Sequence, residues 1–435
     1  MDIDKLEALN WEYHNEGNAN IVFKNLEYKL ALRLRKVNKE FVTNTHKSSI
    51  KKKTNSYSLE QEQRFKDDIL SMYLKGYSRY MHESRLVFLS KNFIQKLLHL
   101  ELDLKRPEFR RTKCFSPKSQ MAIIMPFLGM FLYPLEFPSN KKFVSIELKP
   151  KWGDLPVSNN ITAIKKSWCR FCLHQNMKVL KETKKTASKY CPLDLYGDCK
   201  CKVEHAIISL LETPQNNLKL NLNGFSIKEE DLYQMISLTK ESFTKVVTEI
   251  IHNDSYQENE LEELLNRTAQ SCLNSTFKQH EVHCTKQGLG GVFNLLRRIQ
   301  QFDRHDIENI YAKYLDILDK FDYKLEEFLD FNSRLWNNFK TQGSFTKRSD
   351  EFDVFEICHF LVAATFKDCS VLITFCEAEN RQCHSTSKFV EIFGRLFIYE
   401  IKLIDLDPRS VLNIPYYYKL DQGIVKSWES WDIFL

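Results

Sequence analysis

Apolar and polar residues alternate in several short stretches of the chain, which is the period-two pattern of a half-buried strand. Residues 143–148 alternate in this way, and Lys149 and Lys151 continue their polar face. Pro150 cannot donate to a strand ladder, so the strand is expected to end there with both lysines at its rim. A rim of two cations suits a polyanion. The alternative is an edge strand whose lysines only prevent aggregation.

A second alternating region, residues 11–37, predicts a small antiparallel sheet. The turn at residues 15–18 contains Gly17 and two asparagines, which can adopt positive φ and direct backbone N–H groups toward a phosphate. A plain hairpin turn is the alternative. On the strand that follows, Arg33 and Arg35 fall on one face, where one of them could pair with nucleotide phosphates as the third-strand cation of kinases does.

Apolar residues with a period near 3.6 predict helices in the middle of the chain. A capping box of Ser58 and Gln61 begins the first of them, and its buried stripe is predicted to be Phe65, Ile69, Met72 and Tyr73. Lys178 closes the helix predicted over residues 161–180, in which Trp168 lies near the apolar face. The other helical segments are predicted at residues 90–104, 203–211, 229–252 and 288–339, the last with core candidates that include Leu315 and Leu318.

Acids follow two apolar strands near the C-terminus. Asp368 precedes the strand at 371–375, and the stretch 397–407 ends with Asp405 and Asp407, which alternation places on one face. A carboxylate beside an apolar strand costs desolvation unless a cation meets it, so the pair indicates a Mg²⁺ site. Acids that cap the turn before Pro408 are the alternative.

The length and charge of the chain limit the classes of protein to consider. With 435 residues it can bury a large core in two or three folding units, or form one bilobal enzyme. Its 63 Lys and Arg against 57 Asp and Glu give +6, which by itself does not indicate nucleic-acid binding. Basic pairs and triplets are concentrated in the first half, and such clusters attract phosphate-rich partners.

The compartment follows from the N-terminus and the cysteines. Residues 1–7 contain acids and no apolar segment, so no secretory signal is predicted and we expect an intracellular protein. The longest apolar run, 121–135, is interrupted by prolines and a glycine and is too short for a membrane span. Twelve cysteines at irregular spacings predict reduced thiols, many of them in the core.

These features together predict phosphoryl transfer from a nucleotide, because in that reaction the protein mainly positions groups and neutralises charge. A binding module that retains a polyanion pocket but has lost catalysis is the competing function. Lys149, Asp368 and Asp405 together favour the enzyme, since an anion-binding module has no use for acids beside its ligand.

Several motifs also resemble one enzyme family. Residues 147–153, Glu-Leu-Lys-Pro-Lys-Trp-Gly, are similar to the E-I-K-P-K-x-G signature of inositol-pentakisphosphate 2-kinases. Residues 169–175, Cys-Arg-Phe-Cys-Leu-His-Gln, and 190–195, Tyr-Cys-Pro-Leu-Asp-Leu, resemble the motifs that follow it. The nucleotide loop of the family resembles residues 12–18. Further matches lie at 215–217, 367–370, 403–407 and 414–421, so only 38–57 and 254–286 are gaps.

The resemblance implies an α+β, bilobal, kinase-related fold. Residues 1–130 would form a small β-rich lobe that binds the nucleotide, and 131–435 a larger helical and β lobe with a variable insertion at about 254–286. It also implies ATP- and Mg²⁺-dependent phosphorylation of the axial 2-hydroxyl of inositol 1,3,4,5,6-pentakisphosphate to inositol hexakisphosphate. We expect a monomer in the cytoplasm, the nucleus or both, with no membrane and no specific nucleic-acid partner.

The resemblance also implies roles for individual residues. Lys149 would contact the transferred phosphoryl group or the 2-hydroxyl, Asp368 would be the base, and Asp405, with Asp407 beside it, would bind Mg²⁺. The ATP site would contain Gly17, Asn18, Asn20, Arg33 and Asn217. The substrate phosphates would be held by Arg110, Lys151, Lys178, Lys219, Arg409 and Tyr417.

The substrate's charge agrees with that many cations, because five phosphates carry about −8 to −10. The chain departs from the family pattern at a few positions. The nucleotide loop has one glycine, Trp152 replaces a small residue, Pro408 stiffens the backbone before Arg409, and Asn413 stands where some relatives have a base.

Some members of the family bind zinc in the insertion, and two groups of soft ligands occur in this chain. One is Cys272, His280, His283 and Cys284, and the other is Cys199, Cys201 and His205. Neither group has the spacing of a zinc finger. Free surface residues are the alternative.

Overall fold

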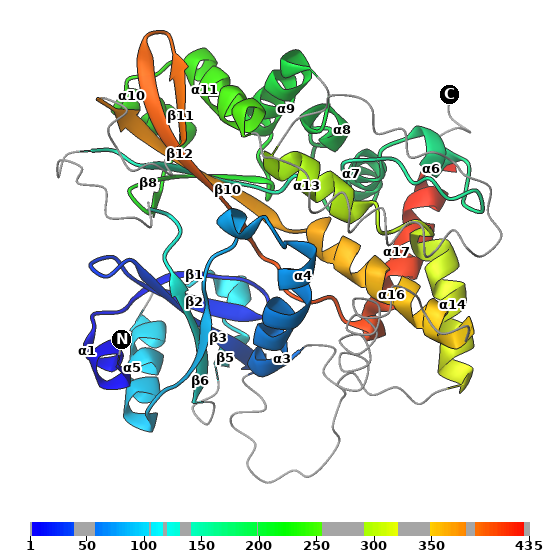
Figure 1. The fold of residues 1–435 in the computed structure, drawn as a ribbon, viewed down its shortest axis with the longest axis horizontal. Helices are drawn as coiled ribbons and strands as arrows, with labels where there is room; N and C mark the ends of the chain where they lie inside the picture. The colour runs from blue at the N-terminus through cyan, green and yellow to red at the C-terminus, as the bar shows by residue number, and fades with distance from the viewer. Residues whose placement is uncertain are drawn as a thin grey trace.

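The computed structural model describes residues 2–38, 57–103, 106–115, 120–130, 141–197, 199–254, 291–320, 349–379 and 388–429. Within these ranges the strands form two six-stranded sheets, and all the strand pairings are antiparallel. Figure 1 shows the first sheet in the lower part of the view and the second in the upper part, with helices beside each. The α+β prediction is confirmed.

The first sheet has the order β1-β2-β3-β6-β4, with β5 paired to β3. The small sheet predicted over residues 11–37 is confirmed by β1, β2 and β3. Phe23 and Leu32 face each other in the register, and both are fully buried. Leu6 of α1 and Phe93 of α5 pack into the same cluster, so these two helices cover the apolar face. The bounds are β1 Glu12–Glu16, β2 Asn20–Asn25, β3 Leu30–Asn38, β4 Arg85–Phe88, β5 Lys113–Phe115, β6 Met121–Pro126, α1 Ile3–Ala8 and α5 Lys91–Asp103.

The second sheet has the order β11-β12-β10-β7-β8-β9. The predicted strand over 143–148 is confirmed as β7, which ends at Leu148. Val371 pairs with Leu148 and Ser370 pairs with Ile404, so the end of β7, the start of β10 and the end of β12 meet at one edge. The bounds are β7 Val144–Leu148, β8 Leu218–Leu222, β9 Phe225–Ser226, β10 Ser370–Ala378, β11 Lys388–Ile392 and β12 Arg395–Ile404.

Four helices pack against the second sheet, and they are α9 Lys200–Glu212, α10 Glu229–Ile236, α11 Lys240–Asn253 and α13 Gly291–Gln300. The segment α3 (Leu59–Arg64), η1 (Phe65–Leu70) and α4 (Ser71–Tyr73) also joins this core. The capping box of Ser58 and Gln61 is present. The predicted stripe of Phe65, Ile69, Met72 and Tyr73 is buried. These side chains belong to the apolar core of the second sheet, not to that of the first sheet.

A group of helices lies at the right of Figure 1. Ile310 of α14, Phe355 of α16 and Ile414 of α17 share one buried cluster, and α7 packs on α17 through Met177 and Ile424. The bounds are α6 Ile164–Ser167, α7 Arg170–Leu180, α8 Pro192–Leu195, α14 Asp306–Lys320, α16 Ser349–Phe366 and α17 Ile414–Glu429, with the short turns η2 Ser78–Tyr80, η3 Glu108–Arg110 and η4 Val411–Asn413.

The single helix predicted over 161–180 was wrong. The chain divides into α6 and α7, and Trp168 between them has an extended backbone with φ −124° and ψ 137°. Its side chain is 48% exposed and lies 4.8 Å, between ring centroids, from Trp428. The apolar period continued through the break because both helices face α17, and periodicity alone cannot show such a break.

Two other helix predictions were too long. The predicted helix 229–252 divides into α10 and α11 at Ser237, whose φ is +53°, and the Thr239 side chain caps α11. The region 288–339 contains α13 and α14, and residues 321–339 lie outside the described ranges. Leu315 and Leu318 are each 44% exposed, so their core assignment was wrong.

The loop 39–56 and the insertion 255–286 also lie outside the described ranges. Among the helices that are described, none combines the length and the apolar run that crossing a bilayer requires.

Candidate active site

A cavity of about 370 Å³ lies where α7, α16 and α17 meet the loops beside β7, β8 and β10. Lys151 and Trp152 enter it from the loop after β7, and Asp368 from the turn between α16 and β10. Segments from four widely separated parts of the sequence therefore build one hollow. Its volume is in the usual range for a small-molecule site.

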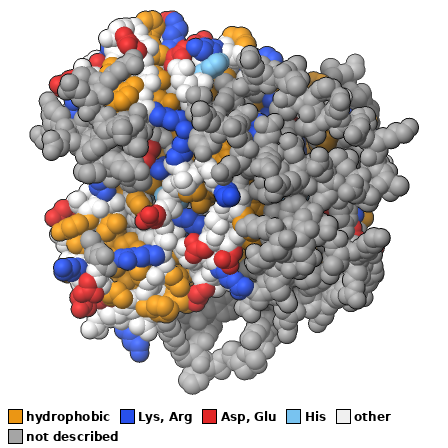
Figure 2. Space-filling view, viewed as in Figure 1, with side chains coloured by type: hydrophobic (Ala, Val, Ile, Leu, Met, Phe, Trp, Pro, Cys, Tyr) orange, Lys and Arg blue, Asp and Glu red, His pale blue; other side chains and the backbone are white. Residues whose placement is uncertain are grey.

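The lining of the cavity is strongly basic. Six basic side chains against one acid, Asp368, give a formal charge of +5 for the lining. On the face in Figure 2, by contrast, basic, acidic and apolar side chains are interspersed. The six are Lys151, Arg170, Lys178, Lys184, Lys367 and Arg409.

Asp368 lies between two of these cations. Lys151 Nζ is 2.7 Å from its Oδ1, and Arg409 Nη2 is 2.7 Å from its Oδ2. Burial raises the pKa of Asp368, but the two cations outweigh burial and lower the pKa to about 2. The carboxylate is therefore ionised at neutral pH, and its side chain remains 48% exposed.

A second cation and acid meet at the same sheet edge. Lys149 Nζ lies 2.9 Å from Asp405 Oδ2, and the Ser370 hydroxyl is 3.3 Å from the same oxygen. Burial raises the pKa of Asp405, but Lys149 outweighs this effect and the net shift is downward. Leu148 pairs with Val371 and Ile404 pairs with Ser370, so Lys149, Asp368 and Asp405 all follow or precede strand ends that meet at one edge. These three residues thus form one cluster, as predicted.

Asp405 and Asp407 do not share a strand face, and that prediction was wrong. β12 ends at Ile404, and Asp405 has φ +60°, so period-two alternation stops before the acids. Asp405 faces Lys149, whereas Asp407 Oδ1 lies 2.6 Å from Arg33 Nη2. The two carboxylates therefore approach the site from different sides.

Arg33 connects the first sheet to the end of β12. Its guanidinium contacts Asp407 and also lies 3.0 Å from Glu62 Oε2 on α3. Arg35 contacts the other oxygen of Glu62, so the prediction that both arginines share one face is confirmed. Only 6% of the Glu62 side chain is exposed. The ion pairs of Glu62 with Arg33 and Arg35 are therefore enclosed between the sheet and α3.

The predicted nucleotide loop does not use positive φ. Among the described residues, positive φ is absent at Gly17, Asn15 and Asn18, so this expectation was wrong. Gly17 instead leaves room, since a Cβ built on it meets no atom within 4 Å. Asn20 is buried, and its Oδ1 accepts no hydrogen bond from any described residue. The Asn217 carbonyl accepts a 2.8 Å bond from Lys149 N at the cavity edge.

The predicted phosphate-binding residues fall into two groups. The cavity is lined by Lys151, Lys178, Arg409 and Tyr417. The other two do not line it. Lys219 lies on β8, where its Nζ is 2.8 Å from Glu147 Oε2, and Arg110 ends η3 beside the first sheet.

Sequence reasoning missed three cations of the lining, Arg170, Lys184 and Lys367. Arg170 and Lys367 both lie over the Trp152 ring. Arg170 Cζ is 4.8 Å from the ring centroid, and Lys367 Nζ is 3.9 Å from it. A cation over an indole ring is attracted by its electron-rich face. Both residues stand inside the motifs 169–175 and 367–370, so the motifs contained the signal.

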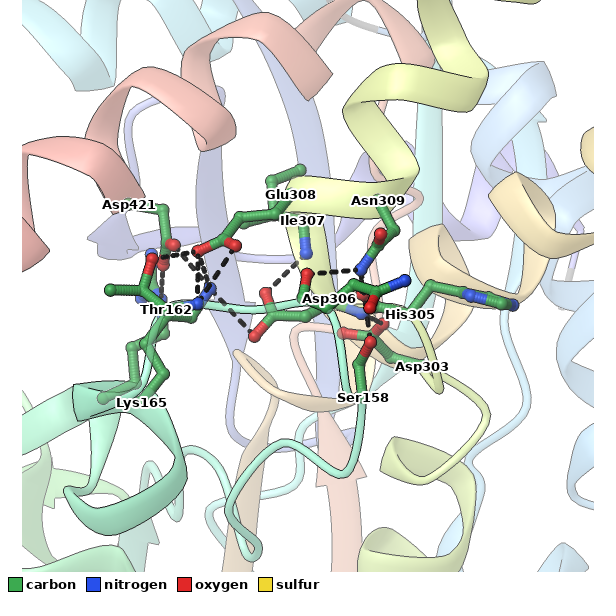
Figure 3. A network of polar contacts seen from close by, with 12 residues as sticks. Ser158, Thr162, Lys165, Asp303, His305, Asp306, Ile307, Glu308, Asn309 and Asp421 are labelled. Atoms are coloured by element: carbon green, nitrogen blue, oxygen red, sulfur yellow. Dashed lines mark hydrogen bonds and ion pairs between the residues drawn. The ribbon is translucent and has the colours of Figure 1, made fainter.

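On the side away from the cavity, Arg170 contacts a buried network of ion pairs. Its Nε lies 2.9 Å from Asp421 Oδ1 on α17. The other oxygen of Asp421 is 2.7 Å from Lys165 Nζ, which also contacts Asp306 and Glu308 at the start of α14. Figure 3 shows Lys165 directed into this group of acids. At most 3% of the Lys165, Asp306 and Asp421 side chains is exposed, so the wall is rigidly supported.

The uneven charge also acts on His174. Burial lowers the pKa of His174 to about 3, with Lys178, Arg170 and Lys151 adding to the effect. Burial and Lys151 likewise lower the pKa of Lys178. Like charges are thus crowded in the cavity, and a polyanion that enters it relieves their repulsion.

The metal-ligand predictions have different outcomes. Cys272, His280, His283 and Cys284 lie outside the described residues. Cys199 and Cys201 form a disulfide, so the prediction of reduced thiols was wrong for this pair and they offer no thiolates beside His205. His205 faces Asp194 instead, at 3.4 Å. Within the described residues one group of three ligands occurs elsewhere, formed by Cys169, Cys172 and Cys191.

A basic cavity with an ionised carboxylate exposed in it defines a site for a polyanion that has a hydroxyl to be oriented. The family model described as inositol-pentakisphosphate 2-kinase matches residues 13–423, and the chain belongs to this family. The resemblance recognised in the motifs is thereby confirmed, and the chain is an inositol phosphate kinase.

Curated relatives agree with the family model. The inositol-pentakisphosphate 2-kinase of Danio rerio is 29% identical over 470 aligned residues, which cover 98% of this chain and 94% of the relative. The enzyme of the same name from Arabidopsis thaliana is 29% identical over 293 residues, covering 65% of this chain and 59% of the relative. Inositol-pentakisphosphate 2-kinase IPK1 of Oryza sativa subsp. indica is 29% identical over 294 residues, which cover 66% of this chain and 61% of the relative.

Proposed function

We propose that the protein transfers the γ-phosphoryl group of ATP to the 2-hydroxyl of inositol 1,3,4,5,6-pentakisphosphate and so forms inositol hexakisphosphate. The observation that carries the proposal is the cavity with six basic side chains around one ionised acid, in a chain of this family. A ligand with a net charge of about −8 to −10 needs such a surplus of cations. Multiple charge-assisted hydrogen bonds fix its orientation.

Asp368 would act on the acceptor hydroxyl. Substrate phosphates that bind Lys151 and Arg409 would replace the Asp368 carboxylate as their partner and leave it free to accept the hydroxyl hydrogen bond. As the new O–P bond forms and the bond to the leaving ADP oxygen breaks, the hydroxyl proton passes to Asp368. Lys149 would neutralise charge on the transferred phosphoryl group.

The nucleotide would lie between the first sheet and the end of β12. Arg33 paired with Glu62 resembles the strand-cation and helix-acid pair that positions phosphates in kinases. Gly17 leaves space beside β1, and the unpartnered Oδ1 of Asn20 points to a missing partner there. Asn18 and Asn217 would complete the nucleotide contacts.

Asp405 and Asp407 fit a Mg²⁺ ion by their chemistry. They offer carboxylate oxygens that are 54% and 40% exposed at the side-chain level, and Mg²⁺ typically takes one or two carboxylates together with substrate phosphates. When bound, the ion would neutralise charge on the β- and γ-phosphates. The residues' own part is to hold it beside Lys149 and Arg33.

The substrate phosphates would be held by Lys151, Lys178, Arg409 and Tyr417, with Arg170, Lys184 and Lys367 added by the geometry of the cavity. Arg110 and Lys219 lie outside it. Arg110 stands beside the first sheet and would reach the substrate only if the two sheets approach each other, so we propose that it contributes on closure. Lys219 lies on β8 in the second sheet and would reach the substrate by exchanging Glu147 for a phosphate.

We further propose a bilobal, kinase-related arrangement with a boundary near residue 130. Its support is the presence of separate apolar clusters around the two sheets. Residues 57–80 lie before that boundary but pack with the second cluster, so this segment would join the lobes. Limited proteolysis with and without the product should show protection at the junction if the lobes close.

We also propose an intracellular monomer, in the cytoplasm, the nucleus or both. Seven of the described cysteines are free, which suits a reducing compartment. Imaging of a fluorescent fusion and sedimentation velocity of the purified protein test the two parts separately.

The decisive experiment is incubation of the purified protein with ATP, Mg²⁺ and inositol 1,3,4,5,6-pentakisphosphate, followed by chromatography and phosphorus NMR of the product. We expect inositol hexakisphosphate and stoichiometric ADP. Tight binding of the pentakisphosphate by folded protein with no product would instead establish the polyanion-binding module and overturn the kinase. Calorimetric binding and circular dichroism on the same sample separate these outcomes.

A further inference from the structure

Three thiols outside the catalytic cluster face one another. Cys169 precedes α7, Cys172 lies in its first turn, and Cys191 precedes α8. Their three sulfurs all lie within 4.8 Å of one another. Cys169 is buried, while Cys172 and Cys191 are partly exposed, so an ion has access to the group. No step of the proposed phosphoryl transfer uses them.

The spacing and distances of the group suit a metal ion. Cys-x-x-Cys is a common ligand pair for zinc, and Zn–S bonds of about 2.3 Å in a tetrahedral site place two sulfurs roughly 3.8 Å apart. Small rotations about the side-chain torsions bring the three sulfurs to that distance. Thiolates select soft or borderline ions such as Zn²⁺ over Mg²⁺.

The three thiols are set apart from other described cysteines. Cys358 and Cys369, for example, are buried and belong to no such group among the described residues.

We infer that Cys169, Cys172 and Cys191 bind one structural Zn²⁺ ion. Within the described residues no fourth ligand from a His, Cys, Asp or Glu side chain belongs to the group, so water completes the tetrahedron. This site uses other residues than the candidate ligands at 272–284.

The position of the site explains what the ion would do for the fold. Cys191 follows Tyr190, whose hydroxyl donates a 2.8 Å hydrogen bond to the Pro150 carbonyl between Lys149 and Lys151. The Tyr190 ring also packs on Phe171 of α7, with 5.6 Å between centroids. An ion on the three cysteines would tie the start of α7 to this segment, and so join two walls of the basic cavity.

The test must separate this site from the insertion. We would therefore use two full-length backgrounds, the natural chain and a variant with C272S, H280N, H283N and C284S. Both are purified under reducing conditions from zinc-supplemented cells without chelators or a histidine tag, and zinc is measured by inductively coupled plasma mass spectrometry. In the second background we expect about one zinc per chain, falling at least about tenfold on Cys172→Ser or Cys191→Ser.

Cys358→Ser is the matched control for Cys172→Ser, because it also removes a thiol from a helix, α16, and it should retain the zinc. Unfolding curves and circular dichroism verify that each variant is folded. If a Cys→Ser variant does not fold, Co²⁺ titration of the metal-free second background replaces it. Sulfur-to-cobalt charge-transfer absorption with tetrahedral d–d bands supports the site, and octahedral bands alone overturn it.

Two further results would also overturn the inference. One is a zinc content that Cys172→Ser and Cys191→Ser leave unchanged in folded protein. The other is a Cys169–Cys172 disulfide, found by mass spectrometry of protein alkylated before reduction, as the resting state in the cell. Because none of these measurements depends on turnover, failure here leaves the proposed kinase activity standing.

Discussion

The first sheet and the basic cavity both contain several basic side chains, yet they pair them differently. In the first sheet, Lys36 and Arg106 surround the carboxylate of Glu16, and at most 3% of any of these three side chains is exposed. Arg33 and Arg35 likewise contact Glu62. Each of these four cations has a carboxylate partner, whereas the buried Lys24 of β2 donates to the Gly224 carbonyl.

In the cavity the pairing is incomplete. Arg170 and Lys367 have acid partners behind the wall, and Lys151 and Arg409 share Asp368. Lys178 and Lys184 have no acid partner among the described residues. The comparison teaches that the number of cations does not mark a ligand site. The surplus of cations over nearby acids does, because a paired ion is already neutralised.

The largest expected effect is at the one acid of the cavity. Asp368→Asn keeps the shape of the side chain but removes the proton acceptor, so kcat should fall about 10³-fold. The KM for inositol pentakisphosphate should not rise, because the variant makes the cavity more positive. Steady-state kinetics measure both, and Lys245→Gln, at an exposed residue of α11, is the control. A kcat within a few fold of the natural protein would contradict the role of Asp368.

Lys36→Met tests the first sheet, whose paired cations are expected to stabilise the fold and not to bind the ligand. It removes one partner of the buried Glu16 carboxylate, and Arg106 remains as the other, so the free energy of unfolding should fall by about 3 kcal/mol. Urea unfolding measures the loss. Calorimetric affinity for inositol hexakisphosphate, measured below the new melting range, should be unchanged. Weaker binding with normal stability would show that the first sheet's cations also serve the ligand.

Lys178→Gln should show the reverse pattern at a smaller scale. One charge-assisted contact to a phosphate is worth about 1.5 to 3 kcal/mol, so the Kd for inositol hexakisphosphate should rise roughly 10- to 100-fold. The free protein should be no less stable, since burial and Lys151 already disfavour this charge. Titration calorimetry at several salt concentrations should also give a shallower salt dependence. An unchanged Kd for inositol hexakisphosphate together with a lower free energy of unfolding would contradict the view that Lys178 serves the ligand and not the fold.

The smallest effect concerns pH. The pKa of His174 is lowered to about 3 mainly by burial, and an unfolded His has a pKa near 6.5, so between these values the unfolded state binds a proton that the native state does not. Stability therefore falls as pH is lowered through this window. In His174→Gln the fall from pH 6.5 to 4.5 should be shallower by roughly 1 kcal/mol per pH unit.

A ligand sharpens this prediction. Bound inositol hexakisphosphate places negative charge beside His174 and should raise its pKa, so the difference between His174→Gln and the natural protein should shrink. His14 of the first sheet, whose pKa burial lowers to about 4, should keep its own effect when the ligand is bound. Urea unfolding across pH, with and without ligand, measures both variants. A difference at His174 that the ligand does not change would place this residue outside the ligand's field.

Much of the local structure could be predicted from the sequence. Alternation predicted β1 to β3 and β7, and the capping box and apolar stripe predicted the helix that begins after Ser58, because backbone geometry repeats locally and burial follows that repeat. The predictions failed where the chain bends for a reason outside the local pattern. The helix breaks at Trp168, which packs on Trp428, although the apolar period continues, and Asp405 leaves the strand with positive φ.

The site was predictable only in part. Its motif residues Lys149, Asp368 and Asp405 were predictable as members of one cluster from family resemblance, and the structure brings them together. Arg170 and Lys367 were missed because their role depends on the Trp152 ring that both contact, and Trp152 is one of the residues at which this chain departs from the family pattern.

The sequence by itself determined the strands β1 to β3 and β7, the start of the helix after Ser58, the family, and the residue types available for the chemistry. Only the tertiary structure decided which cations have acid partners, because those partners lie far away in the sequence, as Asp421 does from Arg170. The same holds for Cys191 and the pair Cys169 and Cys172. Local patterns record burial and backbone geometry, whereas charge balance and metal coordination depend on distances that only the folded chain defines.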